Sequence, residues 1–361
     1  MKIGLIGLPL TGKTTLFNLL TASKVATGSF SGKTQTNIGT ARVPDERIDF
    51  LSDLYKPKKT TYAQIEFVDV AGFAASVEGQ KSSAAKFLND VRTCDALVHV
   101  LRAFVSPQVV HVNENINPGK DLETVEMELL FADIEVIDKR IERLKNGKKM
   151  TKENIEELEL LQKCYAVLEE GGSMLDVKLT EEERTSLRNY AFLTEKPRLA
   201  VVNLDEQQFK AKDYPNRTEL MAMCAEKDIP LLEICVLMEL EISDLDEADK
   251  DLFIEDMGMT ETGIELLSRR VYEHMGLISF FTVGEDEVKA WTISRALKAK
   301  EAAGKIHSDI ERGFIRAEVV KYRDIAELGN MVKIKEKGLF RLEGKEYPVE
   351  DGDIINFRFN V

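Results

Sequence analysis

The stretch GLPLTGKT at residues 7–14 decides the fold. It matches the pattern GxxxxGK[ST] of a phosphate-binding loop, in which glycines let backbone N–H groups turn toward phosphate. An apolar run precedes it at residues 2–7, and a helical pattern follows it at residues 14–22. The motif needs this context, because the positive N-terminus of the helix adds to the attraction for an anion. The sequence therefore predicts a phosphate-binding loop rather than an accidental glycine-rich turn.

The last residues of the motif carry the chemistry. We expect Lys13 to reach the β- and γ-phosphates and to stabilise charge during hydrolysis, which makes it a catalytic candidate. The Thr14 hydroxyl is expected to coordinate Mg²⁺. The nucleotide-binding residues predicted in this loop are Leu10, Thr11, Gly12, Lys13, Thr14 and Thr15.

Short apolar runs rich in Val and Ile alternate with helical patterns along the chain. The runs lie at residues 2–7, 64–70, 96–101, 198–202 and 230–236. Runs of this kind are typical of a parallel sheet covered by helices on both faces. The sequence therefore predicts an α/β fold with a doubly wound sheet.

Between residues 121 and 194 no strand candidate appears. Apolar residues at three- and four-residue spacing on two arms, separated by a polar turn at 146–153, predict an antiparallel helical hairpin of the coiled-coil type. Thr180 and Glu183 form a capping box that opens a third helix. The seam residues predicted for the second arm are Ile155, Leu158, Leu161, Tyr165 and Leu168.

The last 85 or so residues differ in character from the rest of the chain. Strand candidates at 280–283, 288–293 and 354–360 surround one helical stretch at 295–304. This pattern predicts a small mixed sheet that clasps one helix. The predicted domains are a nucleotide-binding domain at 1–120 and 195–277, the inserted hairpin at 121–194, and the C-terminal domain at 278–361.

The charge is strongly acidic and unevenly distributed. The chain has 63 Asp and Glu against 49 Lys and Arg, a net charge of −14, which argues against a general or sequence-specific DNA binder with a broad basic face. Residues 276–361 are neutral, whereas residues 121–195 hold 19 acidic and 11 basic side chains. The hairpin is thus either a solvated helical arm or an arm that docks a partner.

Four cysteines at positions 94, 164, 224 and 235 form no CxxC pattern. This spacing favours free thiols in a reducing compartment over disulfides or a zinc site. No run of 18 apolar residues occurs, and the N-terminal apolar run lacks a cleavage site. We therefore expect a cytoplasmic protein without a membrane segment.

A second motif, DVAG at residues 69–72, ends an apolar run. It matches the DxxG element of P-loop GTPases, in which the Asp holds magnesium through water and the Gly amide senses the γ-phosphate. Asp69 is therefore a predicted metal-site residue and Gly72 a predicted nucleotide-binding residue. Phe73 stands where relatives of Ras have a Gln that orients the attacking water. A phenyl ring cannot do this, so hydrolysis needs another group or is slow.

A third motif, NLDE at residues 203–206, stands where a guanine-reading NKxD element would be. Leu204 replaces the Lys, and Glu206 replaces the Asp that accepts two hydrogen bonds from guanine. We therefore expect Asn203, Leu204 and Glu206 to bind a base without a preference for guanine. Cys235 ends the last core run, where a loop should border the base, and is either a base neighbour or a core residue.

The order of these motifs resembles that of the YchF or Obg-like ATPase family, a branch of the Obg-related GTPases in which NxxE accompanies ATP preference. The likeness spans essentially the whole chain. Its further signature stretches are VPDERIDFL at 43–51, FVDVAGF at 67–73, IHSDIERGFIRAEVV at 306–320 and EYPVEDGDIINFRFNV at 346–361.

The resemblance implies several further properties. The C-terminal domain would be a TGS domain with a β-grasp fold, the hairpin the family's coiled-coil domain, and the partner the ribosome. The family's proposed catalytic His would fall on His111, although a His flanked by valines is also typical of a partly buried strand or loop. Aligning on residues 37–39 places Lys33 where the family has a magnesium-binding Thr, with Thr34 and Thr36 nearby.

These observations favour a Mg²⁺-dependent ATPase whose nucleotide state controls binding to a large partner. Two alternatives remain open at this stage. A GTPase of the translation-factor type would require Glu206 to bind guanine. An adaptor that senses ATP or ADP without hydrolysis would agree with Phe73 and Lys33.

Overall fold

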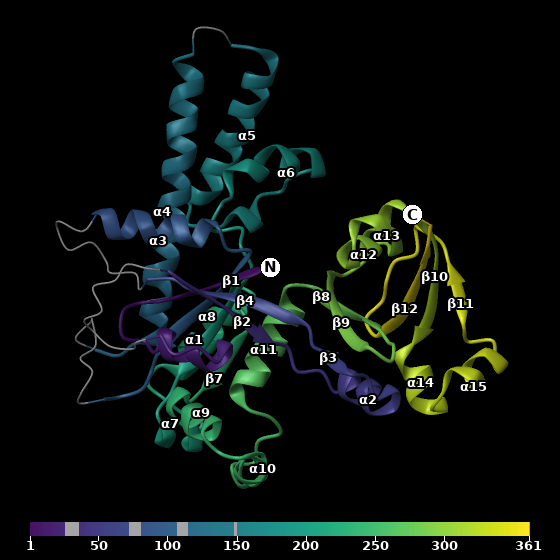
Figure 1. Ribbon diagram of the computed structural model, residues 1–361. Coiled ribbons are helices and arrows are strands. Elements are labelled where there is room, and N and C mark those ends of the chain that lie inside the picture. Colours follow the sequence, from purple (N-terminus) through teal and green to yellow (C-terminus); the bar gives the residue numbers. More distant parts are fainter. Residues whose placement is uncertain (26–35, 72–80, 107–114, 148–149, 361) are drawn as a thin grey trace. The chain divides into compact units, whose positions relative to one another are not determined.

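The computed structural model describes residues 1–25, 36–71, 81–106, 115–147 and 150–360 (Figure 1). The chain divides into two compact units. The first comprises Met1–Gly39 and Glu66–Met259, and the second comprises Thr40–Ile65 and Thr260–Val361. Within the described ranges, no helix has both the length and the apolar character needed to cross a bilayer.

The first sheet has six strands in the order β2-β4-β1-β5-β6-β7. The neighbours from β4 to β7 pair in parallel, which confirms the predicted doubly wound α/β fold. The bounds are β1 (Lys2–Ile6), β2 (Asn37–Arg42), β4 (Gln64–Asp69), β5 (Ala96–Arg102), β6 (Arg198–Asn203) and β7 (Leu231–Ile234). The associated helices are α1 (Lys13–Thr21), α3 (Lys81–Arg92), α7 (Glu206–Ala211), α8 (Arg217–Glu226), α9 (Val236–Ser243) and α10 (Glu247–Asp256).

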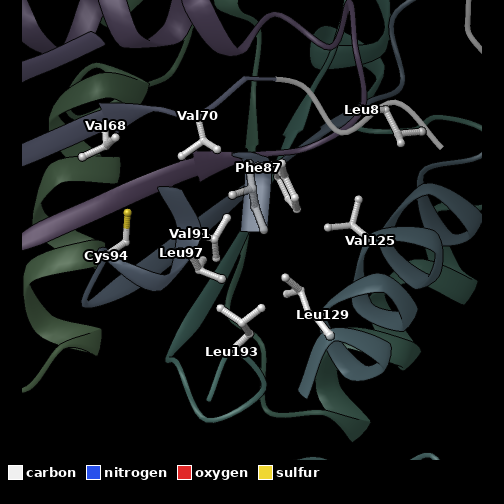
Figure 2. Close-up of a cluster of buried hydrophobic side chains, with 12 residues drawn as sticks. Leu8, Val68, Val70, Phe87, Val91, Cys94, Leu97, Val125, Leu129 and Leu193 are labelled. Carbon is white, nitrogen blue, oxygen red and sulfur yellow. The ribbon is translucent and has the colours of Figure 1, made fainter. Parts of the chain in front are cut away.

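The short apolar runs become strands because they are buried on both faces. All seven residues of β5 are buried, as are four of the five residues of β1. Figure 2 shows side chains from β1, β4 and β5 packed with those of α3, including Phe87 and Val91. This packing fixes the C-terminal ends of the strands, from which the motif loops start.

The predicted hairpin consists of α4 (Pro118–Lys145) and α5 (Lys152–Glu169), which extend side by side in Figure 1. The first half of α4 packs on the sheet through Val125 and Leu129 (Figure 2). Its second half packs against α5, where Leu161 and Leu168 are buried as predicted. The seam position predicted at Ile155 is wrong, because this side chain lies in the first turn of α5 and is 43 % exposed.

The chain returns from the hairpin to β6 through α6 (Glu181–Leu187), which the capping box of Thr180 and Glu183 opens as predicted. Single-turn helices at Met174–Asp176 and Arg188–Tyr190 flank it. The buried carboxylate of Asp133 on α4 accepts hydrogen bonds from the backbone N–H groups of Leu193 and Thr194 at 2.9 and 2.8 Å. These bonds fix the base of the hairpin to the segment that leads into β6.

The second unit contains a mixed sheet in the order β11-β10-β12-β8-β9-β3, and α12 packs on one face of it. Its strands are β3 (Lys59–Thr61), β8 (Leu277–Thr282), β9 (Glu287–Ser294), β10 (Phe314–Lys321), β11 (Arg341–Glu343) and β12 (Asp353–Phe359). Its helices are α2 (Glu46–Tyr55), α11 (Gly263–His274), α12 (Ala299–Ile306), α13 (Ser308–Arg312), α14 (Tyr322–Leu328) and α15 (Met331–Glu336). A mixed sheet clasping a helix was predicted for this region, although the helix begins four residues later than expected.

The segment 40–65 groups with the C-terminal residues, whereas the sequence analysis assigned it to the nucleotide-binding domain. Strand β3 extends the second sheet by pairing in parallel with β9. Arg47 on α2 donates to both oxygens of Asp351, at 2.7 and 3.2 Å, and to the carboxylate of Asp45. Two of the signature stretches, 43–51 and 346–361, therefore meet in one ion-pair network within this unit.

Candidate nucleotide-binding site

The loop between β1 and α1 has the backbone that the motif predicts. Gly7 and Gly12 have φ values of 143° and 94°, and Leu10, with φ 63°, is a left-handed non-glycine residue. A Cβ at Gly7 would collide with the carbonyl oxygen of Val100, and one at Gly12 would collide with the side-chain amide of Asn203. Only glycine fits these two positions. Gly12 leaves the first N–H groups of α1 without a side-chain cap, so they can bind an anion.

Lys13 is folded back onto this loop. Its Nζ donates to the carbonyl oxygens of Gly7 at 3.1 Å and Leu8 at 2.7 Å, and only 6 % of the residue is exposed. Burial lowers the pKa of Lys13 to about 8, and the charge of Asp69 partly opposes this shift. An incoming phosphate would replace the carbonyl oxygens as the partner of a lysine that is already desolvated.

Thr14 and Asp69 meet beside this lysine. The Thr14 hydroxyl donates to Asp69 Oδ2 at 3.0 Å, and Asn37 Nδ2 donates to the same oxygen at 3.4 Å. Burial raises the pKa of Asp69, although the hydrogen bond from Thr14 and the charge of Lys13 oppose this. A buried carboxylate beside a hydroxyl is a set of hard oxygen donors. This set suits a magnesium ion that takes its other ligands from phosphate and water.

Asn203 connects the third motif to the loop. Its Nδ2 donates to the Thr11 carbonyl oxygen at 3.0 Å, and its Oδ1 accepts from the Val236 N–H at 3.2 Å. Thr11 is also buried, and its hydroxyl donates to the Leu8 carbonyl oxygen. One side chain thus holds the phosphate loop, the end of β6 and the start of α9 together.

The other predicted base-site residues are placed differently. Leu204 is only 2 % exposed and lies in a hydrophobic cluster with Val202 and Tyr214, inside the unit. Glu206 is exposed at the start of α7, and its Oε1 accepts from Lys210 Nζ at 2.6 Å. Cys235 is buried at the start of α9, and burial raises the pKa of its thiol.

The structure thus brings Gly12, Lys13, Thr14, Asp69 and Asn203 to one end of the sheet. Thr15 follows them on α1 and is half-buried. Two predicted site residues, Gly72 and His111, lie outside the described residues, as do Lys33 and Phe73.

Asn37 was not predicted as a site residue, although its amide contacts Asp69. His99 on β5 was not predicted either. Burial lowers the pKa of His99 to about 3, so the imidazole beside Lys13 is neutral. Every residue of β5 is buried, so the strand pattern cannot distinguish such a side chain from an ordinary core residue.

Relatives of known name cover the chain from end to end. "Ribosome-binding ATPase YchF" of Bacillus subtilis is 40 % identical over 100 % of both chains. The protein of the same name from Haemophilus influenzae is 39 % identical over 100 % of this chain and 99 % of its own. The chain belongs to the YchF family. This confirms the resemblance drawn from the motifs.

Family models and solved structures agree with this assignment. Residues 277–360 match the YchF-GTPase_C model, described as "Protein of unknown function (DUF933)", and residues 2–137 match a model described as "50S ribosome-binding GTPase". The YchF GTPase of Schizosaccharomyces pombe has a TM-score of 0.87 at 28 % identity, over 99 % of this chain and 97 % of its own. A GTP-binding protein of Pyrococcus horikoshii, at 18 % identity and a TM-score of 0.61, shares the fold.

If Lys13 binds the phosphates of ATP, its lowered pKa predicts how the affinity depends on pH. Phosphates bind the protonated amine more tightly than the neutral one. The affinity for ATP should therefore be highest at pH values below the pKa that Lys13 has in the ligand-free protein, and it should fall as the pH rises above that pKa. The Kd for ATP should be constant up to about pH 7.5 and rise roughly tenfold per pH unit above pH 8. Isothermal titration calorimetry between pH 6.5 and 9.5 measures this.

The Lys13→Arg variant is the matched control, because guanidinium stays protonated throughout this range. Its Kd should not change with pH, even if binding is weaker. A wild-type Kd that does not change up to pH 9.5, or one that rises equally in Lys13→Arg, would contradict the assignment of Lys13.

Proposed function

We propose that this member of the YchF family is a Mg²⁺-dependent ATPase whose nucleotide state controls its binding to the ribosome. The observation that carries the proposal is the group formed by the uncapped start of α1, the buried Lys13 and the Thr14–Asp69 pair. Catalysis of phosphoryl transfer depends mainly on positioning and on charge stabilisation, and these groups supply both.

In the proposed mechanism, the loop amides and Lys13 bind the phosphates and stabilise the charge that develops as water attacks the γ-phosphate. Thr14 and Asp69 would hold Mg²⁺, which neutralises phosphate charge when bound. Asn203 keeps the loop in place through the carbonyl of Thr11. Hydrolysis needs a further group to orient or deprotonate water, because Phe73 has no polar atom.

The arrangement around NLDE supports a preference for adenine. Leu204 lies in the hydrophobic core, so no cation from this position can pack over a guanine base. Glu206 is one methylene longer than the Asp of a guanine-reading site, and it already accepts from Lys210. Both features remove interactions that guanine would use.

Base preference can be tested with Glu206 alone, because Leu204→Lys would place a charged group in the core. We expect wild type to bind ATP and ADP more tightly than GTP and GDP in competition titrations. Glu206→Asp should shift the ratio of the two affinities toward guanine by about tenfold, at the lower end of what one well-placed polar pair contributes to discrimination.

Lys210→Met is the matched control, since it removes the hydrogen-bond partner of Glu206 but keeps Glu206 itself, whose side chain is longer than that of Asp. It should leave the preference for adenine in place. If wild type binds GTP at least as tightly as ATP, the GTPase alternative replaces the ATPase proposal.

For the missing water-orienting group we propose His111. The strand β5 precedes His111 in the chain and ends at the side of the sheet where ligands bind in doubly wound folds. A His with an ordinary pKa of about 6.5 accepts a proton at neutral pH. His111→Ala should lower kcat by roughly 10²-fold at saturating ATP and Mg²⁺, with little change in ATP affinity. Equal, measurable turnover in both proteins would exclude this role, and no turnover in either protein would favour the non-hydrolysing adaptor.

The ribosome is proposed as partner because the named relatives are ribosome-binding ATPases. In an acidic chain, contact with RNA must be local, and the exposed lysines Lys333 and Lys337 at α15 offer one such place. We expect the full chain to cosediment with purified ribosomes, more with ATP than with ADP. Lys333→Glu with Lys337→Glu should reduce this binding at least fivefold.

The control for that experiment is Lys139→Glu with Lys152→Glu, which reverses the charges of two exposed lysines of the hairpin. This double variant should still bind ribosomes. Failure of the wild-type chain to cosediment in either nucleotide state would contradict the proposed partner. Equal loss in both double variants would contradict the α15 contact.

A further inference from the structure

The second unit contains a hollow at the point where β8 ends beside β12 (Figure 1). Its volume is about 170 Å³, and nine of the twelve residues that line it are apolar. Val283, Met331 and Phe340 belong to this lining and are only half-buried, so the hollow can be reached from the surface. A cavity of about 150 Å³ is enough to hold a benzene ring. The hollow can therefore take one phenyl ring or one branched aliphatic side chain.

The polar residues of the lining already have partners. Both oxygens of Glu318 accept, one from Asn356 Nδ2 at 2.7 Å and the other from Arg358 Nε at 2.6 Å. The Thr282 hydroxyl oxygen accepts from Trp291 Nε1 at 3.0 Å. A polar group that enters such a site loses water and finds few free partners, which is unfavourable. The hollow thus suits an apolar group.

Basic side chains lie next to this hollow. Arg316 and Arg358 stand directly opposite each other on β10 and β12, on the same face as Glu318. Like charges in such a pair repel each other. Arg358 has Glu318 as its partner, whereas Arg316 is exposed and has no ion-pair partner among the residues that the structure describes. The exposed Lys335 lies with its Nζ 5.1 Å from the centre of the Phe340 ring.

We propose that the hollow and its basic edge bind an acidic segment of a partner protein. One large apolar side chain of the segment would fill the hollow, and carboxylates of its neighbours would pair with Arg316 and Lys335. An anion at Arg316 would also offset the repulsion from Arg358. Because residues 276–361 are neutral overall, the acidic character of the rest of the chain does not extend to this surface. The proposal goes beyond the proposed function and does not depend on it.

A single strand of RNA is the competing occupant, since its phosphates would also pair with basic side chains. Its base would have to bury polar edges against apolar walls, beside a carboxylate whose oxygens are already used. The observations therefore favour the protein segment.

The chain carries its own reporter for this site. Its single tryptophan, Trp291, donates to Thr282 in the wall of the hollow, so its emission should change when the hollow is filled. The probe is a blocked peptide with Phe at its centre and three Glu on each side, titrated into the full chain. We expect a saturable change with a Kd below about 1 mM. Replacing the central Phe by Ala, or all Glu by Lys, should weaken binding at least fivefold.

Two variants test the two parts of the site separately. Val283→Phe should fill the hollow, raise the Kd at least fivefold and remove the advantage of Phe over Ala in the peptide. Arg316→Glu should raise the Kd of the acidic peptide at least fivefold. The matched control is Arg295→Glu, an exposed arginine that follows the Ser294–Leu277 pair at the other end of the β8–β9 hairpin. It should change the Kd by less than twofold, and circular dichroism confirms that each variant is folded.

No saturable change in Trp291 emission with the acidic peptide would overturn the proposal. Equal weakening in Arg316→Glu and Arg295→Glu would do the same, because binding would then reflect net charge only. If single-stranded oligouridylate binds more tightly than the peptide, and Val283→Phe weakens that binding, the site is an RNA site and the proposed partner is wrong.

Discussion

The close contact between Gly12 and the side-chain amide of Asn203 is the constraint on which the site depends. No Cβ fits between them, and the Asn203 amide also holds the carbonyl of Thr11. The phosphate loop is therefore shaped from two sides, by its own glycines and by the end of β6. Because Asn203 also accepts from the Val236 N–H, the loop and the start of α9 keep one geometry. The α/β fold brings together the end of β1, where the phosphate loop starts, and the end of β6, where Asn203 lies.

The same unit combines rigid and adjustable polar contacts. The buried Asp133 fixes the base of the hairpin with backbone donors on both sides of its carboxylate, and a contact of this kind is expensive to break. By contrast, Lys13 donates to carbonyls of its own loop, and Asn37 is held by a single side-chain bond. The weaker contacts gather where a ligand would exchange partners, as expected if binding replaces them.

Much of the first unit could be predicted from the sequence, because its signals are local. Fully apolar runs become buried parallel strands, and the glycine pattern of residues 7–14 allows few other structures. The pairing of β3 with β9 left no such signal, since Lys59–Thr61 is short and polar. Arg47 and Asp351 lie 304 positions apart, and only the folded chain brings them together.

The candidate site was predictable to a similar extent. Lys13, Thr14 and Asp69 followed from motif spacing, whereas the contact of Asn37 with Asp69 joins two segments that only the fold brings together. Leu204 was expected beside a base, but it lies within the core, because motif spacing places a residue along the chain and does not determine its burial.

The most direct test of this account is a calorimetric titration of ATP into wild type and Lys13→Ala, with and without Mg²⁺. We expect wild type to bind ATP, and Mg²⁺ to strengthen the binding. Lys13→Ala should remain folded by circular dichroism and lose at least 10²-fold in affinity, because the phosphates lose their charged partner in a desolvated site. A folded Lys13→Ala variant that binds ATP as tightly as wild type would contradict the central claim that this loop is the nucleotide site.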